Sequence, residues 1–274
     1  MNNYQKLLTN TKTLYSYEHL CPVCAQNLLI ENHYLICDEL AQDWKLSDYE
    51  QRKFNFREGS LCQHCKSSVR LRNLAKVFLD IVNLHYEFNL QNMEDLVKNN
   101  HLINLNIAEI NHCGTIHEYL AQLPNLYYSE YDSANKFVRH EDLMNLTYSD
   151  KYFDVVLMSD VLEHVPNIEI ALQEIFRVMK DNGHFIFTIP FLYDRMTHVR
   201  AKISTNGEII YLDTPSYHGD YSTKMIDHLV FYEFGKDFIE LLEKYFSVCI
   251  YNFDDYGEET TITFYCTKKG KNKC

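Results

Sequence analysis

The sequence lacks any run of the roughly 20 apolar residues that a membrane-spanning helix requires. Its N-terminus, Met1-Asn2-Asn3-Tyr4-Gln5-Lys6, also lacks the charged and then apolar layout of a secretory signal peptide. Hydrophobic residues make up 46% and charged residues 23% of the chain, as in an ordinary globular protein. We therefore expect a cytoplasmic protein whose 274 residues form one domain with an appendage or two small domains.

Positive charge is scarce as well. The chain has 26 Lys and Arg against 38 Asp and Glu, a net charge of −12, which disfavours a general surface for polyanions such as nucleic acids. Residues 45–76 are an exception, with eight basic and three acidic residues. This basic patch either docks a phosphate-bearing substrate or is a solvated helix face, and both interpretations stay open.

A disulfide framework is not expected either, because nine cysteines is an odd number and a cytosolic chain keeps its thiols reduced. Two C-x-x-C pairs stand 37 residues apart, and four thiolates converging on one ion are the pattern of structural zinc. The four expected zinc ligands are Cys21, Cys24, Cys62 and Cys65. Cys37 and His64 are spare candidates. A redox role is the rival, but the pairs lack the strand and helix that surround such a motif in thioredoxins.

Residues 152–190 carry the strongest secondary-structure pattern. The apolar run 153–158 predicts a buried strand, and the spacing of apolar residues over 168–179 predicts a helix that Asn167 can cap. Residues 181–183 are expected to end that helix, and 184–189 to form the next strand. The polar loop 160–166 lies between the first strand and the helix. In doubly wound sheets, ligands bind at the carboxyl ends of the strands. We therefore expect the chemistry to take place at the loop 160–166.

This unit resembles the second half of a class I S-adenosylmethionine-dependent methyltransferase. The helix that ends in Arg177-Val178-Met179-Lys180-Asp181-Asn182-Gly183 resembles the family's corresponding helix, and Glu141-Asp142-Leu143 resembles its adenine-contacting turn. Residues 102–110 and 126–129 look like the first and second strands. The resemblance covers roughly residues 100–267. It implies an α/β, Rossmann-like sheet of seven strands with an antiparallel last strand, preceded by a small zinc-knuckle domain.

A subset of these enzymes carries a zinc knuckle of the form C-x-x-C-x-S-x-x-R-x-R that runs into a helix, and residues 62–72 resemble it. The turn 215–220 resembles a P-x-x-H-G-[ND] element of the same subset. The expected organisation is a zinc-binding module (1–75), a linking helix (76–100) and a methyltransferase domain (101–274). An insertion at 191–229 in that domain is expected to act as a lid over the acceptor.

The resemblance also implies which residues hold the methyl donor, S-adenosylmethionine. They are Asn106, Ala108, Gly114, Glu130, Asp142, Leu143, Asp160 and Leu162. Asn106 stands where an acidic residue is usual and Ala108 where the first glycine is usual. Glu130 is expected to accept both ribose hydroxyls, with Asp132 as the fallback. Asp142 and Leu143 are expected beside the adenine.

Two histidines are candidates for the proton acceptor, because imidazole titrates near neutral pH. His164 lies in the polar loop and His218 in the insertion. Each could instead only brace its loop through hydrogen bonds.

The sequence thus predicts a methyltransferase that acts on a small molecule, through a hydroxyl of a sugar, a glycan precursor or a nucleotide-sugar; the glycan part follows from the resemblance alone. A nucleic-acid substrate is not expected. One alternative is an RNA or protein methyltransferase that docks its substrate through the zinc module. Another is a non-catalytic, zinc-stabilised interaction module, which Asn106 and Ala108 favour. The oligomeric state stays open.

Overall fold

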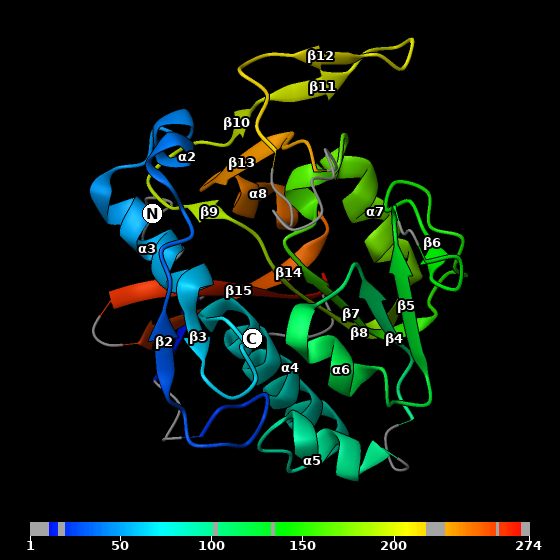
Figure 1. The fold of residues 1–274 in the computed structure, drawn as a ribbon. Helices are drawn as coiled ribbons and strands as arrows, with labels where there is room; N and C mark the ends of the chain where they lie inside the picture. Colours follow the sequence, from blue (N-terminus) through cyan, green and yellow to red (C-terminus); the bar gives the residue numbers. More distant parts are fainter. Residues whose placement is uncertain are drawn as a thin grey trace.

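The computed structural model describes residues 11–15, 20–100, 104–132, 135–217, 228–255 and 258–269 (Figure 1). His218 lies outside the described residues. The elements up to the first central strand are β1 (Thr11–Tyr15), β2 (Ile30–Asn32), α2 (Asp38–Asp43), α3 (Asp48–Gly59), β3 (Ser60–Cys62), α4 (Val69–Tyr86), α5 (Met93–Lys98) and β4 (Ile107–Ile110). Next come η2 (Gly114–Ile116), α6 (His117–Leu120), β5 (Leu126–Glu130), β6 (Arg139–His140), β7 (Phe153–Ser159), η3 (Leu162–His164), α7 (Ile168–Val178) and β8 (Met179–Thr188). The last are β9 (Phe191–Leu192), β10 (His198–Val199), β11 (Ala201–Ile203), β12 (Ile209–Tyr211), β13 (Tyr232–Gly235), α8 (Phe238–Leu242), β14 (Phe246–Asp255) and β15 (Glu258–Lys268).

The central sheet has the strand order β1-β14-β15-β8-β7-β4-β5-β6. Strands β8, β7, β4, β5 and β6 pair in parallel, whereas β15 runs antiparallel to both of its neighbours, β8 and β14. The seven strands from β14 to β6 therefore confirm the predicted Rossmann-like order with an antiparallel last strand. β1 adds an eighth strand, which pairs in parallel with β14.

Helices cover both faces of the sheet (Figure 1). α4 packs against β15 and β8, while α7 contacts β8 and α8 contacts β14. α4 begins at a side-chain cap, since the Ser68 hydroxyl accepts a hydrogen bond from the Leu71 amide at 3.3 Å. Asn167 caps α7 in the same way through the Ile170 amide at 3.2 Å, as the sequence predicts. Two apolar cores result, one on each face.

The sequence prediction for the end of α7 needs correction. The helix ends at Val178, and β8 begins directly at Met179 instead of near residue 184. Residues 181–183 are therefore part of a strand and not the left-handed end of a helix. Gly183 is required there by close approach, because an added Cβ would lie 2.9 Å from the Phe153 carbonyl oxygen.

The N-terminal module and the insertion lie against the carboxyl end of this sheet. Strands β9, β10 and β13 form a small three-stranded sheet, and β11 pairs with β12. Arg200, which is 1% exposed, donates to the Asp43 carbonyl at 2.9 Å and the Thr214 carbonyl at 2.6 Å, and it also pairs with Glu233. Cys21 and Cys62 belong to the same apolar cluster as α4. The predicted domain boundaries at 75 and 100 stay a prediction about independent folding.

None of the helices in the described ranges is both long enough and apolar enough to cross a membrane.

A buried histidine makes stability depend on pH. His184 is 1% exposed, bonded to the Tyr265 hydroxyl at 2.9 Å, and burial beside His85 lowers its pKa to about 3. The unfolded chain takes up this proton below about pH 6.5 and the folded protein only near pH 3. The contribution of His184 is thus complete above pH 6.5 and falls by on the order of 1.4 kcal/mol per pH unit as the pH decreases.

Urea unfolding between pH 7 and pH 4.5 should show this loss. The free energy of unfolding should depend less steeply on pH in the His184→Gln variant than in wild type. The exposed His33 supplies the control, because His33→Gln should keep the wild-type slope. Parallel curves for wild type and His184→Gln would contradict the assignment.

Candidate functional site

The four predicted cysteines form one cluster. Their sulfur atoms all lie within 4.8 Å of one another, with separations of 3.8 Å for Cys21–Cys65 and 3.9 Å for Cys24–Cys62. A tetrahedral Zn²⁺ with Zn–S bonds of about 2.3 Å requires sulfur separations of about 3.8 Å. The cluster therefore fits a closed, structural zinc site.

Both knuckles have the same backbone shape. The Ala25 amide donates to the Cys21 carbonyl at 2.9 Å, and the Lys66 amide donates to the Cys62 carbonyl at 2.8 Å. Ala25 and Lys66 both adopt left-handed conformations, with φ of 59° and 60°. In each knuckle the turn directs two sulfur atoms towards one point. Ser67 adds a hydroxyl 3.0 Å from the Cys65 sulfur.

The loop that follows β4 is held by hydrogen bonds to a buried carboxylate, that of Glu109. Glu109, with no exposed surface, accepts hydrogen bonds from the Cys113 amide at 2.8 Å and His117 Nδ1 at 2.7 Å. Asn111 and Gly114 take left-handed conformations, with φ of 62° and 56°. An added Cβ at Gly114 would lie 2.6 Å from Leu71 Cδ1 of α4, so the loop needs a glycine here.

We therefore revise the sequence prediction for this loop. Asn106 precedes β4 and is tied to the other end of the sheet, through its amide to Asp154 at 2.9 Å and its side chain to the Tyr152 carbonyl at 3.1 Å. Ala108 is fully buried within β4. Neither side chain reaches the carboxyl edge. The acidic residue at the base of the loop is Glu109, three residues after Asn106.

Glu130 ends β5 on the same edge of the sheet, as predicted, and the Tyr128 hydroxyl donates to one of its carboxylate oxygens. Asp142 forms a turn in which its carboxylate accepts from the Met144 amide at 2.8 Å. Leu143 is 5% exposed and Leu162 is fully buried, both in the core between the sheet and α7.

A cavity of about 580 Å³, here called the edge cavity, opens at the carboxyl ends of β4 and β7. From the Rossmann-like fold it is lined by Asn111, His112, Gly114, Ser159, Asp160, Glu163 and His164. From the N-terminal module it is lined by Leu40, Trp44, Leu46, Phe54, Arg57 and Arg70. The volume is in the range of small-molecule sites. The edge cavity thus gathers three of the predicted site residues, namely Gly114, Asp160 and His164.

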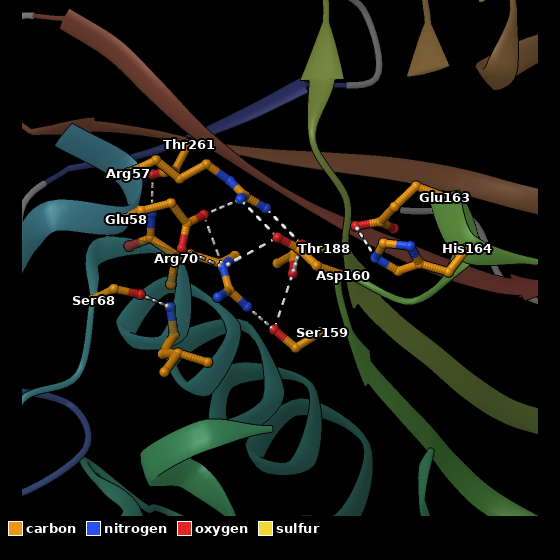
Figure 2. Close-up of polar contacts among 12 residues, drawn as sticks. Arg57, Glu58, Ser68, Arg70, Ser159, Asp160, Glu163, His164, Thr188 and Thr261 are labelled. Carbon is orange, nitrogen blue, oxygen red and sulfur yellow. Dashed lines mark hydrogen bonds and ion pairs between the residues drawn. The ribbon is translucent and has the colours of Figure 1, made fainter. Parts of the chain in front are cut away.

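A network of charges joins the two parts at the cavity (Figure 2). Arg57 of α3 holds both carboxylate oxygens of Asp160, at 2.8 and 2.7 Å. Arg70 of α4 lies 3.3 Å from the same carboxylate and bonds Glu58 at 3.0 and 3.1 Å. Thr188 donates to Asp160 at 2.8 Å. The carboxylate of Asp160 is therefore engaged by the protein itself and anchors the N-terminal module.

Asp160 is held in its charged form. Burial acts to raise the pKa of this carboxyl, but the guanidinium groups of Arg57 and Arg70 outweigh burial and lower it well below its usual range. Asp160 also adopts a left-handed backbone, with φ of 51°. A non-glycine residue in this conformation at the head of the loop is backbone strain of the kind that clusters at functional sites.

Glu163 and His164 occupy η3 on the other side of Asp160 (Figure 2). Glu163 is 1% exposed, and burial followed by the charge of Asp160 raises the pKa of its carboxyl well above the usual value. Its oxygen Oε1 lies 3.7 Å from His164 Nε2. His164 Nδ1 lies 3.2 Å from the Leu229 carbonyl oxygen.

The sequence analysis did not predict that arginines of the N-terminal module would contribute to this site. Arg57, Arg70 and Arg72 belong to the basic patch 45–76, for which the sequence left open a docking surface or a solvated helix face. Arg57 and Arg72 are buried, at 5% and 2% exposure, and serve internal contacts. The available signal was the S-x-x-R-x-R motif, which places two arginines on the first turn of α4.

Comparisons with known proteins agree with this geometry. Residues 114–187 match the family described as "Methyltransferase domain". Over 68 residues the chain is 35% identical to "Probable polyketide synthase 13" of Dictyostelium discoideum, a match that covers 24% of this chain and 2% of that protein. The chain thus spans only a small part of the curated relative that it matches.

Solved structures are more distant. An S-adenosylmethionine-dependent methyltransferase from Mesorhizobium loti is 12% identical with a TM-score of 0.36, covering 59% of this chain and 89% of that one. A "possible histamine N-methyltransferase" from Thermotoga maritima is 17% identical with a TM-score of 0.38, covering 72% and 99%. At such scores these are likenesses only, and the fold assignment follows from the strand order and the family match.

The cysteine cluster yields a first prediction for this site. The purified protein should contain about one zinc per chain, and Cys21→Ser should lose the metal and much of its stability, because structural zinc contributes folding free energy directly. Elemental analysis and thermal unfolding measure both. Cys37→Ser is the control, since Cys37 lies outside the cluster. Protein without stoichiometric metal would refute the zinc site.

The charge network around Asp160 yields a second prediction for this site. Arg57→Ala leaves the carboxylate of Asp160 without its bidentate partner, and breaking such a buried pair should lower the free energy of unfolding by about 3–5 kcal/mol. Lys244→Ala breaks an exposed pair with Glu169 of similar length, 3.0 Å, and should cost about 0–1 kcal/mol. Urea unfolding compares the two, and equal losses would contradict the anchoring role.

Proposed function

The chain contains a class I S-adenosylmethionine-dependent methyltransferase domain, and from this premise we propose that it transfers a methyl group from S-adenosylmethionine to a small-molecule acceptor. The observation that carries the proposal is the edge cavity. It opens where the loop after β4 and the loop after β7 meet, which is where ligands bind in doubly wound sheets. When bound, the donor supplies an electrophilic methyl group on a sulfonium.

The donor would be held by residues on one edge. The turn of Asn111 to Gly114 lies next to the cavity, and Glu130 offers the carboxylate oxygen that Tyr128 does not occupy to the ribose hydroxyls. Asp142 and Leu143 would lie beside the adenine. Asp160 would act indirectly, because its carboxylate is already held by Arg57.

The acceptor would enter from the side of the N-terminal module. There the cavity is lined by Trp44 and Phe54 together with polar groups of Tyr217, His228 and His164. An aromatic wall with hydroxyl and imidazole groups suits an acceptor that has both an apolar face and hydroxyls, which supports a sugar or glycan precursor. His164 would take the proton of the hydroxyl that is methylated.

The rival functions are less well supported. An RNA methyltransferase would need exposed cations, and Arg57 and Arg72 of the basic patch are not available for this because both are buried in internal contacts. A non-catalytic module would have no use for a cavity that collects acids and histidines at the carboxyl edge. Failure to bind S-adenosylmethionine would favour that module over the enzyme.

Calorimetry with S-adenosylmethionine tests the proposal. Wild type should bind the donor, and Glu130→Ala should bind it about ten- to a hundredfold more weakly, since a charge-assisted hydrogen bond contributes about 1.5–3 kcal/mol. Asp132→Ala, two residues further along, is the matched control and should bind like wild type. The reverse result would move the ribose contact to Asp132, and no binding by wild type would overturn the proposed function.

A further inference from the structure

Glu163 is a buried acid that the fold itself does not use. Neither of its carboxylate oxygens has a hydrogen-bond partner among the described residues, although the side chain is 1% exposed. A buried carboxyl without partners is unfavourable, since it loses its contacts with water and gains none. Glu163 also lines the edge cavity, although its two carboxylate oxygens are themselves buried.

Other buried acids of this protein are treated differently. Glu109 accepts from the Cys113 amide and from His117, as described above. Glu141, 2% exposed, accepts from the Thr147 amide at 2.8 Å and the Thr147 hydroxyl at 2.6 Å, and pairs with Arg139. Glu109 and Glu141 are thus bonded on both carboxylate oxygens. Glu163 differs from these two acids, and it lies at the edge cavity.

The charges around Glu163 favour its neutral form. Asp160 on one side is negative, and the positive Arg57 and Arg70 that face the same region are already paired with Asp160 and Glu58. His164 lies on the other side, with the ring of His228 5.2 Å from that of His164. Burial and Asp160 together raise the pKa of the Glu163 carboxyl, so this group can both donate and accept a hydrogen bond.

The orientation of His164 complements this carboxyl. With Nδ1 3.2 Å from the Leu229 carbonyl oxygen, we assign the ring hydrogen to Nδ1, which leaves the lone pair on Nε2. That lone pair lies 3.7 Å from Glu163 Oε1. Two atoms at this separation can both make hydrogen bonds of ordinary length to a single oxygen atom.

We propose that Glu163 and His164 form a paired binding site for one neutral hydroxyl group of the methyl acceptor, with Glu163 as the residue that positions this hydroxyl. The inference rests on the proposed function and names the acceptor group. The hydroxyl donates its hydrogen to His164 Nε2 and accepts one from Glu163. As the O–CH₃ bond forms, the S–CH₃ bond breaks with its electron pair going to sulfur, and the hydroxyl proton passes to Nε2.

A site of this kind discriminates by hydrogen bonding. A hydroxyl satisfies the donor of Glu163 and the acceptor of His164 at once, whereas an alkylammonium ion has no lone pair for the Glu163 hydrogen. Leaving such buried groups unpaired is how an enzyme rejects an analogue. Glu163 would therefore select hydroxyl acceptors over charged amines.

The first measurement is thermal unfolding of Glu163→Leu and Glu163→Gln beside the matched variant Glu141→Leu. Removal of an unsatisfied carboxyl should raise the melting temperature of Glu163→Leu by about 2–4 °C, and Glu163→Gln should unfold near wild type. Glu141→Leu should unfold at a lower temperature, because Thr147 and Arg139 lose their acceptor. A lower melting temperature in both Glu163 variants would make Glu163 a structural residue and overturn the proposal.

The second measurement follows the carboxyl directly. Protein labelled with ¹³C at the glutamate carboxyls gives a Glu163 resonance, identified by its absence in Glu163→Gln. With S-adenosylhomocysteine present, glucose and glycerol should shift this resonance and propylamine should not. A resonance that only propylamine moves, or that neither hydroxyl compound moves, overturns the proposal. Loss of S-adenosylmethionine binding by wild type would instead overturn the proposed function, while the unfolding result for Glu163 would still stand.

Discussion

The ion pair between Arg57 and Asp160 is the contact on which the arrangement of the site depends. It joins α3 of the N-terminal module to the first residue after β7 (Figure 2), and both residues line the edge cavity. A charge buried this deeply is stable only with its partner in place, so the two parts of the chain cannot shift independently without exposing or orphaning it. The module is therefore part of the cavity wall and not an appendage tethered beside it.

The cysteine cluster contributes indirectly to the same wall of the edge cavity, through helix α4. Its second knuckle runs directly into α4, whose first turn carries Arg70 and Arg72. Arg72 donates to the carbonyls of Ser60 and Ser67 at 3.1 and 2.5 Å, which fixes the knuckle to the helix. Arg70 reaches Glu58 and Asp160. Each fixed position of the C-x-x-C-x-S-x-x-R-x-R motif thus has a physical task, from bringing the sulfur atoms of the cluster together to setting the charge at the loop.

The insertion is the third part of the wall. Arg195 donates to the carbonyls of Trp44 and Lys45 at 2.8 and 2.6 Å, and Arg200 reaches Asp43. Trp44 in turn donates its indole hydrogen to Ser216 at 3.1 Å. These contacts attach the described part of the insertion to the N-terminal module. An acceptor in the edge cavity would therefore meet side chains from three segments that are far apart in the sequence.

The sequence by itself determined the class of sheet, with its antiparallel last strand, the zinc-type cluster and the position of the polar loop. Those features follow from local periodicity, from paired cysteines and from a resemblance whose motifs are contiguous. It could not determine the register of the loop after β4, because Glu109, not Asn106, proves to be the acid at its base only when its bonds to Cys113 and His117 are visible. Nor could it predict that Asp160 would be engaged by Arg57, 103 residues earlier. Only the tertiary structure decides which ionisable groups become neighbours, and burial then shifts their pKa values, as at Glu163, whose carboxylate oxygens have no hydrogen-bond partner among the described residues.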